Sequence, residues 1–474
     1  MKKTALVYGN FNILHPGHLR LLKFAKESSD YLIVAVNSDN LTKELNLLDE
    51  QTRLESIKAT SFVDEAFILN ENIISYIKNT KPTIIVKGKE HESKENLEEE
   101  ILKTYGGKLL FTSGEIGFSS LDLLQKDFEI NNSFINHANS YIKRHKIQKE
   151  NLIKYIENFS KLNVLVIGDT IIDEYITCDP IGMSQEDPTI VVTPLSNKKF
   201  IGGAAIVASH AKTLGANVSY ISVVGEDDNF SYTKKYLKNL NIKVNLHKDN
   251  TRPTTLKQRF RAHNKTLLRV NHLKQHYINK DLEKSLIKQI KESKKLDLII
   301  FSDFSYGVLT KNVIKKISKF ALKNNISMVA DSQSSSQVGD IAKFENMDIV
   351  TPTEREIRLS LNDFESGLVV LSEKLQEKSN PKYIFTTLGS EGVMIYNSNK
   401  DELLTDNIPA LNNNAKDVSG AGDSLLTCSS MAKRIGANIW EASYLGSIAA
   451  AIQVSRIGNI PIQKEELLKE IRNL

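Results

Sequence analysis

Two histidines spaced three positions apart lie just after the first apolar run of the chain, in the sequence His15-Pro16-Gly17-His18. The φ angle of Pro16 suits the first turn of a helix, and a helix N-terminus offers N–H groups and a favourable dipole to an anion. Both imidazoles can face one phosphate there and stabilise the charge that develops during an in-line displacement. Taken alone, the pair also fits a helix cap or a metal site.

A second group of chemical interest lies near the C-terminus, in the sequence Asp417-Val418-Ser419-Gly420-Ala421-Gly422-Asp423 ahead of a predicted helix. Small residues let the backbone close around a phosphate, and the helix N-terminus adds its dipole. We expect Gly420, Ala421 and Gly422 to bind phosphate. Asp423 is then placed to take a proton from an attacking hydroxyl group, so this pattern predicts phosphoryl transfer.

The elements around the two histidines alternate between short β-rich runs and amphipathic helical patterns. This alternation is typical of a parallel α/β sheet with helices on its faces, and we assign residues 1–135 to such a domain. The predicted strands are Thr4–Tyr8, Tyr31–Val36, Ala66–Leu69, Thr83–Val86 and Lys108–Phe111, and the predicted helices are Leu19–Glu27, Glu50–Thr60 and Glu92–Lys103.

A polar, Lys-rich helical connector is predicted at residues 136–160, with one apolar stripe and with His137 and His145 in solvent. Residues 161–474 form a second, larger α/β domain that opens on a strand at Asn163. Within it, the alternating, Pro-containing segment Thr177–Phe200 predicts a β-excursion that stands off the main sheet. Later strands of this domain are predicted at Val218–Val224, Leu298–Phe301, Ser327–Ala330, Asp348–Val350 and Tyr383–Thr386.

Composition and charge narrow the classes of protein that fit. The 474 residues allow two or three domains, and the net charge of +5, with basic residues spread along the chain, predicts neither nucleic-acid nor membrane binding. Cys178 and Cys428 are too few for a disulfide framework or a zinc site, so we expect a reducing compartment and two inert core residues. No apolar run reaches about 18 residues, and none near the start suits a signal peptide. We therefore predict a cytoplasmic protein.

Nearly all of residues 1–130 resemble the HxGH cytidylyltransferase-like nucleotidyltransferase family, which implies a small Rossmann-like domain. The resemblance rests on the His15–His18 motif and on segments at residues 34–39, 51–53, 86–88 and 117–120. One departure is Asn12, where the family usually has Asp, because an amide keeps the hydrogen-bonding shape but loses the negative charge. The implied site residues are His15 and His18 for the triphosphate, Lys87 and Gly88 for the sugar-phosphate side, Ser119 and Ser120 for closure on the nucleotide, and Phe11, Asn12 and Lys43 as further nucleotide or phosphate contacts.

About residues 161–460 resemble the PfkB/ribokinase family of sugar kinases, to whose signature the segment Asp417–Asp423 is similar. The resemblance implies a ribokinase-like α/β domain in which the excursion Thr177–Phe200 is a β lid that often also builds a dimer. It further implies a sugar side, a nucleotide turn and a magnesium site reached through water. These implied residues are Asp173, Gly202, Gly203 and Arg259 for the sugar, Thr387, Gly389 and Gly392 for the nucleotide, and Glu356 for the metal.

The pairing of the two domains resembles the bifunctional heptose kinase/nucleotidylyltransferase family of ADP-heptose synthesis, with the domain order reversed. Those enzymes phosphorylate D-glycero-D-manno-heptose 7-phosphate at O1 and make ADP-heptose from heptose 1-phosphate. The kinase pocket departs from this family, because Ile206 replaces an Asn while Tyr306 and Gln333 replace lysines. Fewer cations weaken the case for a substrate that carries a 7-phosphate, and Arg259 and Arg261 are candidates to compensate.

The sequence therefore predicts a bifunctional sugar-activating enzyme for surface-glycan synthesis. One activity is an ATP-dependent kinase of a heptose-type sugar or sugar phosphate, and the other is a nucleotidylyltransferase that forms an NDP-sugar and releases pyrophosphate. Mg²⁺ is the expected cofactor, ATP the phosphoryl donor and either ATP or CTP the nucleotidyl donor. The expected partners are these small molecules and a second copy of the chain, bound through the lid. Two alternatives stay open: a glycerol- or alditol-phosphate-type cytidylyltransferase fused to a kinase for another sugar, and a non-catalytic binding protein, which Asn12 and Ile206 favour.

Overall fold

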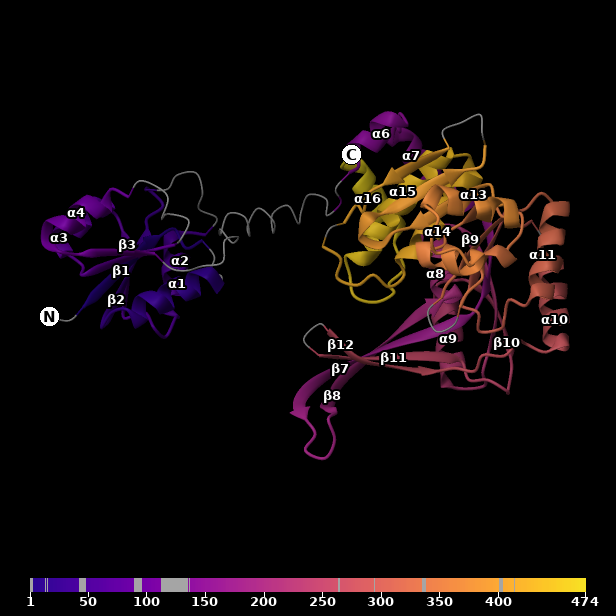
Figure 1. Cartoon of the computed structure of the whole chain (residues 1–474), viewed down its shortest axis with the longest axis horizontal. Helices are drawn as coiled ribbons and strands as arrows, with labels where there is room; N and C mark the ends of the chain where they lie inside the picture. Colours follow the sequence, from indigo (N-terminus) through magenta and orange to yellow (C-terminus); the bar gives the residue numbers. More distant parts are fainter. Residues whose placement is uncertain are drawn as a thin grey trace. The chain divides into compact units, whose positions relative to one another are not determined.

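The structure is a computed structural model that divides the chain into two compact units, Met1–Asn132 and Ser133–Leu474 (Figure 1). It describes residues 3–12, 14, 16–41, 48–88, 96–111, 135, 137–262, 265–293, 295–334, 338–399, 404–412 and 414–474, with the backbone alone at 16, 17 and 20. Within these residues no helix is both long and apolar enough to cross a membrane.

The first unit is a five-stranded sheet in the order β3-β2-β1-β4-β5, in which every pair of neighbours is parallel. Side chains alternate across it, so that Ala5 and Val7 of the central strand pack with α1 and α2 while Leu6 packs with α3 and α4. The predicted parallel α/β fold is confirmed. The strands are β1 (Thr4–Gly9), β2 (Tyr31–Asn37), β3 (Glu65–Leu69), β4 (Ile84–Lys87) and β5 (Lys108–Phe111), and the helices are α1 (Pro16–Glu27), α2 (Glu50–Lys58), α3 (Ile73–Thr80) and α4 (Glu98–Tyr105).

The second unit contains a nine-stranded sheet in the order β10-β9-β6-β13-β14-β15-β16-β17-β18. The pairs from β10 to β16 are parallel, and β17 and β18 are added antiparallel at one edge. Parallel strands buried on both faces read as continuous apolar runs, and β6 and β13 do so. The strands are β6 (Asn163–Gly168), β9 (Asn217–Val224), β10 (Lys243–Lys248), β13 (Leu298–Asp303), β14 (Ser327–Ser332), β15 (Ile349–Val350), β16 (Tyr383–Thr387), β17 (Val393–Asn397) and β18 (Thr405–Ile408).

Helices cover both faces of this sheet. One apolar cluster joins the sheet to α7 (Lys149–Asn158), α8, α9 and α14–α16, and a second joins its other face to α10–α13. This arrangement is the ribokinase-like α/β domain that the sequence predicts. The helices are α8 (Ala204–Thr213), α9 (Asp228–Asn239), α10 (Lys280–Lys291), α11 (Lys311–Lys323), α12 (Glu354–Leu361), α13 (Leu368–Ser379), α14 (Ala421–Ile435), α15 (Ile439–Val454) and α16 (Lys464–Arg472).

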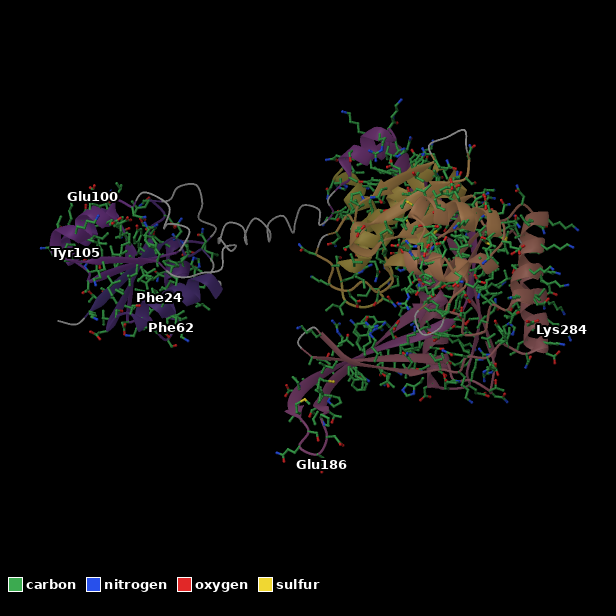
Figure 2. All side chains as sticks on the ribbon, viewed as in Figure 1. Phe24, Phe62, Glu100, Tyr105, Glu186 and Lys284 are labelled. Atoms are coloured by element: carbon green, nitrogen blue, oxygen red, sulfur yellow. The ribbon has the colours of Figure 1, made fainter. Side chains whose placement is uncertain are left out.

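A separate four-stranded sheet in the order β12-β11-β7-β8 forms the lid. It consists of β7 (Thr170–Met183), β8 (Ile190–Gly203), β11 (Thr255–Ala262) and β12 (Lys265–His272). The β7–β8 hairpin extends away from the nine-stranded sheet, and Figure 2 labels Glu186 at its tip. The excursion is therefore longer than the predicted segment. Asp173, the predicted sugar contact, lies within lid strand β7, opposite Phe200 of β8.

The segment between the two predicted domains is part of the second unit. It forms two short helices, α6 (Asn139–Arg144) and α7 (Lys149–Asn158), followed by a 3₁₀ turn. Tyr141 is buried in the same core as α15. His145 stacks on Trp440 with ring centres 4.4 Å apart, and its Nε2 lies 2.6 Å from Asp406 Oδ2. The prediction that His145 is solvated was wrong, because this segment packs against α15 and β18 of the second unit.

Candidate active sites

A cavity of about 670 Å³ lies in the second unit, where the lid meets the carboxyl ends of the sheet strands and the start of α14. It brings together predicted residues from parts of the sequence that are far apart. Gly202 does not line the cavity but lies directly behind Asp173. The predicted residues that line it are Asp173, Gly203, Arg259, Glu356, Thr387, Gly389, Gly392, Gly420, Ala421, Gly422 and Asp423.

The predicted anion hole is the turn that starts α14. Gly420 precedes the helix with φ +78°, a left-handed conformation that favours glycine, and a Cβ there would lie 2.7 Å from Asn459 Oδ1. The first turn of α14, from Ala421, borders the cavity. A phosphate at this end of the cavity would therefore meet backbone N–H groups and the positive end of a helix dipole.

Asp423 lies in that first turn, only 4% exposed. Burial, and then the charge of Asp173, raise the pKa of Asp423 to about 7, against a smaller opposing effect of Lys257. Gln333 Nε2 donates to Asp423 Oδ1 at 3.4 Å. A buried carboxyl with a pKa near neutrality has the properties that a general base needs.

Asp173 faces the cavity from the lid and is held by two donors. The Arg259 guanidinium donates to Asp173 Oδ1, and Asn459 Nδ2 donates to Oδ2 at 3.1 Å. Gly202 must be small, since a Cβ at this position would lie 2.4 Å from Asp173 Oδ2. The oriented carboxylate is suited to accept hydrogen bonds from sugar hydroxyls, the role predicted for it.

The turn predicted to bind the nucleotide follows β16 and also lines the cavity. Gly389 and Gly392 both have positive φ, +61° and +101°, and a Cβ at Gly392 would lie 2.0 Å from Ile408 O. The cavity continues beside this turn into an apolar part that can receive the flat face of a nucleobase. It is lined by Val393, Ile408, Leu411, Ala450, Ala451 and Val454.

Two further carboxylates, Asp331 and Glu356, border the cavity near Asp423. Glu356 caps α12, and its two oxygens accept from Ser334 N at 2.7 Å and Thr353 N at 2.8 Å. Burial, and then Glu356 and Asp423, raise the pKa of Asp331 well above its usual value. Such a concentration of negative charge suits a divalent cation.

The donor set fits magnesium bound together with a nucleotide. Among the described residues, no three His, Cys, Asp or Glu side chains group closely enough to hold a metal ion by themselves. Mg²⁺ usually takes one or two carboxylates and fills its remaining positions with water and substrate phosphates. Asp331 and Glu356 match that pattern and would hold the ion, Glu356 through water, since both of its oxygens already accept backbone N–H groups.

The three residues that differ from the resembled heptose kinases, Ile206, Gln333 and Tyr306, lie in different surroundings from one another. Ile206 lies on α8, is fully buried in the apolar core and does not line the cavity. Gln333 donates to Asp331 and Asp423. Tyr306 is buried, and Lys257 Nζ lies 5.4 Å from its ring centre and 5.1 Å from that of Phe304.

Lys257, Asn459 and Asp331 were not predicted as site residues. Lys257 on β11 pairs in register with Asp173 on β7, and this places it beside the cavity. Of the described residues that line the cavity, Lys257 and Arg259 are the only cations. Their spacing of two on one strand, which puts both side chains on the same face, was the available sequence signal.

The second candidate site lies in the first unit, where the carboxyl ends of the adjacent strands β1 and β4 meet. Asn12 is 3% exposed, and the His18 ring packs on Phe11 with ring centres 5.2 Å apart. Lys87 Nζ lies 3.1 Å from Glu98 Oε1, and Gly88 follows directly. The structure thus places described members of the predicted set at one sheet edge. The predicted contacts His15, Lys43, Ser119 and Ser120 lie outside the described residues.

A buried arginine organises this edge. Arg53 is fully buried and donates to Asn10 O at 2.7 Å and Leu48 O at 3.0 Å, while its Nη2 lies 2.5 Å from Asp39 Oδ1. It therefore ties the loop after β1 to the loop after β2. The segment 51–53 that carries part of the resemblance thus has a structural role next to Phe11 and Asn12.

Comparison with known proteins assigns both units. The family model "pfkB family carbohydrate kinase" matches residues 161–465, and the model "Cytidylyltransferase-like" matches residues 6–110. The chain therefore belongs to the pfkB family of carbohydrate kinases and carries a cytidylyltransferase-like domain ahead of the kinase domain. This order is the reverse of that in the resembled bifunctional family.

Among curated proteins, the chain is 32% identical over 314 residues to "Bifunctional protein HldE" of Aliarcobacter butzleri (strain RM4018). It is also 32% identical over 315 residues to the protein of the same name from Campylobacter jejuni subsp. jejuni serotype O:6. Each alignment covers 65% of this chain, and the chain spans 64% of the length of each relative.

Among solved structures, ribokinase from Thermotoga maritima matches with a TM-score of 0.51 at 21% identity, covering 66% of this chain and 99% of that one. Phosphofructokinase-2 from Escherichia coli matches with a TM-score of 0.54 at 15% identity, covering 66% and 98%. These two likenesses establish the ribokinase-like fold.

Proposed function

We propose that this chain activates a sugar in two steps: its pfkB unit phosphorylates a heptose-type sugar phosphate at the anomeric hydroxyl, and its first unit transfers a nucleotidyl group to a sugar 1-phosphate. The main support for the kinase activity is that Asp173, Asp423 and the Gly420–Gly422 turn line one cavity. Names of the relatives support the pairing of two activities. The product would enter surface-glycan assembly.

The phosphoryl transfer follows from the arrangement of the cavity. Asp173 and Arg259 orient the acceptor, and Asp423 takes the proton from its attacking hydroxyl. The acceptor oxygen forms a bond to the γ-phosphorus as the bond from that phosphorus to the β–γ bridging oxygen breaks, so ADP leaves. The turn at Gly420–Gly422 stabilises charge on the transferring group. Mg²⁺, held near Asp331 and Glu356, would neutralise the phosphate oxygens.

Lys257 supports an acceptor that already carries a phosphate. Its register places it next to Asp173, on the sugar side of the cavity. Lys257 thereby supplies a positive charge to the cavity. The uncharged side chains of Tyr306 and Gln333, which replace lysines of the resembled family, do not supply one. Arg259 is engaged with the Asp173 carboxylate, and the Arg261 guanidinium carbon lies 5.3 Å from the ring centre of Tyr175.

In the first unit, the proposed reaction is attack of a sugar 1-phosphate oxygen on the α-phosphorus of a nucleoside triphosphate, with pyrophosphate leaving. His15 and His18 would stabilise the α-phosphate charge, and Lys87 with Gly88 would bind the sugar-phosphate side. Phe11, Asn12, Lys43 and the pair Ser119 and Ser120 would complete the nucleotide contacts. ATP is the proposed donor, with CTP as the competing substrate in the test below.

A homodimer through the lid is also part of the proposal. The lid sheet exposes large apolar side chains, an arrangement that an unpaired soluble sheet usually avoids. These are Ile181 (68% exposed), Met183 (61%), Ile190 (57%), Leu195 (67%) and Leu268 (56%). Sedimentation of the wild type against Ile181→Lys/Leu195→Lys would test this, and a monomeric wild type would contradict it.

The kinase proposal is tested by following ADP release from Mg-ATP. The acceptors are D-glycero-D-manno-heptose 7-phosphate and a panel of unphosphorylated sugars. We expect turnover on the 7-phosphate, with Lys257→Met raising the KM for it about tenfold or more and Lys257→Arg serving as the charge-retaining control. Turnover only on unphosphorylated sugars would refute the phosphate-bearing acceptor, and no turnover would favour a binding protein.

The nucleotidyl step is tested separately by pyrophosphate release from ATP or CTP with D-glycero-D-manno-heptose 1-phosphate. We expect release with ATP. Release only with CTP and an alditol phosphate would replace the proposal by an alditol-phosphate-type cytidylyltransferase.

A further inference from the structure

A closed chain of contacts joins the predicted sugar contact to the predicted anion hole by way of the lid. Asp173 on β7 accepts from Arg259 and from Asn459. The guanidinium carbon of Arg259 lies 5.1 Å from the ring centre of Tyr175, which is two residues beyond Asp173 on the same strand. The Tyr175 hydroxyl then reaches the loop that leads into α14.

That contact is a hydrogen bond from the Tyr175 hydroxyl to Asp417 Oδ2, 2.7 Å long. Burial raises the pKa of Tyr175 to about 12, so the phenol keeps its proton. Burial alone would raise the pKa of Asp417, but hydrogen bonds from Tyr175, Ser419 and Gly458 outweigh it and lower that pKa. The bond therefore runs from a neutral phenol to a carboxylate, which is among the stronger kinds of hydrogen bond.

Asp417 organises the start of the anion-hole loop. Its Oδ1 accepts from Ser419 N at 3.0 Å, and its Oδ2 accepts from Gly458 N at 3.0 Å as well as from Tyr175. Gly458 precedes Asn459, the residue that donates to Asp173. The Asp417 carboxylate thus fixes the backbone immediately before Gly420. It also holds the backbone next to Asn459, which in turn binds Asp173 on the sugar side.

The position of the Tyr175 ring is fixed by its surroundings. The side chain is 7% exposed, and the Phe200 ring packs edge-on with centres 5.1 Å apart. Phe200 is in turn held against Gly458, where a Cβ would lie 2.5 Å from its ring. The phenol can therefore act as a rigid link between the lid and the loop.

We infer that Tyr175 is a positioning residue that holds the anion-hole loop in its phosphate-binding conformation by tying Asp417 to lid strand β7. Its effect on turnover rests on the proposed kinase function. Its effect on the loop does not, because the contacts are internal to the protein.

The loop effect is tested by hydrogen–deuterium exchange on the full chain without ligand. In Tyr175→Phe we expect faster exchange of the peptide that spans residues 416–424, by about tenfold. Tyr220→Phe is the matched control, because it also removes a buried tyrosine hydrogen bond, 2.7 Å to Thr170, but does not touch the loop. The control should leave that peptide unchanged.

The effect on turnover is tested on the acceptor found in the ADP-release panel. We expect kcat to fall about tenfold or more in Tyr175→Phe while the acceptor KM changes less than twofold, since Arg259 still holds Asp173. Asp417→Asn should give a similar loss, and the double variant should be no worse than Asp417→Asn alone. If Tyr175→Phe fails to fold, both the exchange and the turnover measurements are made on Asp417→Asn instead.

Three results would overturn the inference: unchanged exchange at 416–424 in Tyr175→Phe, faster exchange with unchanged kcat, or losses that add in the double variant. A wild type that turns over no acceptor would instead refute the proposed function, and the exchange experiment would still decide the role of Tyr175 in the loop.

Discussion

Asp173 on lid strand β7 and Asp423 in the first turn of helix α14 face the same cavity, and the charge of Asp173 is second only to burial in raising the pKa of Asp423 to about 7 from 3.8. Lys257 opposes this shift, and Asp331 on β14 interacts with the same carboxyl. The proposed base is therefore half-ionised near neutral pH. Its ionisation depends on groups contributed by the lid as well as by the main sheet.

The rate of phosphorylation should therefore depend on pH near neutrality. Because the base must be deprotonated, kcat/KM should fall tenfold per pH unit below about 7 and level off above it. Lys257→Met should move this acid limb to higher pH, because the positive charge that favours the carboxylate is lost. Initial rates from pH 5.5 to 9, with Lys257→Arg as the control, measure it. If the acid limb of kcat/KM in the wild type has its midpoint near pH 4, Asp423 is excluded as the titrating base.

Replacing the base should separate the two activities. Asp423→Asn keeps the shape of the side chain but cannot take a proton, so phosphorylation should fall about 10²–10⁴-fold while nucleotidyl transfer is unchanged. Parallel assays of ADP and pyrophosphate release on one preparation check this. Loss of both activities together would show that the units do not act independently.

The same substitution should stabilise the second unit at high pH. The folded-state pKa of Asp423 is raised, so the wild type loses stability as pH rises from about 4 through about 7. An Asn side chain does not ionise, so the variant does not lose stability in this way. The gain from Asp423→Asn should reach up to about 4 kcal/mol above pH 8 and vanish near pH 4. Urea unfolding at pH 4.5, 6.5 and 8.5 measures it.

Asp249→Asn is the control of opposite sign. Burial alone would raise the pKa of Asp249, but hydrogen bonds from Thr251 and the charge of Arg252 outweigh it and lower that pKa. Its carboxylate therefore contributes stability above its unfolded pKa, and Asn should destabilise the protein at neutral pH. Equal pH profiles for the two variants would contradict the assignment.

His18→Ala should affect only the first unit. Its imidazole lies beside Phe11 at the edge proposed to bind the triphosphate, so pyrophosphate release should fall about 10²–10³-fold while ADP release from the kinase reaction is unchanged. Both rates are measured on the same sample, with circular dichroism as the check on folding. A matched drop in both rates would contradict the assignment.

Local patterns predicted most of the elements that carry the sites. The strands of the first unit alternate with helices over short distances, and the Asp417–Asp423 segment combines small residues with a helix start, so each could be identified from a few consecutive residues. Helix α3 (Ile73–Thr80) was missed.

The contacts that complete the kinase cavity depend on pairing between distant strands. Arg259 and Asp173 are 86 residues apart and meet only because β11 adds to β7, and the same pairing places Lys257. His145 was misjudged for a related reason, because its surroundings come from Trp440 on α15 and Asp406 on β18. No local sequence pattern indicates contacts between such distant segments.

The side chains proposed to choose the acceptor belong to the four-stranded lid sheet, whereas the anion hole and Asp423 belong to α14. The residues that would decide which molecule is modified therefore lie on other elements than the residues that would carry out the transfer, and the two sets are coupled through the charge of Asp173 on Asp423 and the hydrogen bond from Tyr175 to Asp417. A succession of acceptors during evolution would then be expected to change positions of β7 and β11 outside these contacts, while one phosphoryl-transfer apparatus is kept.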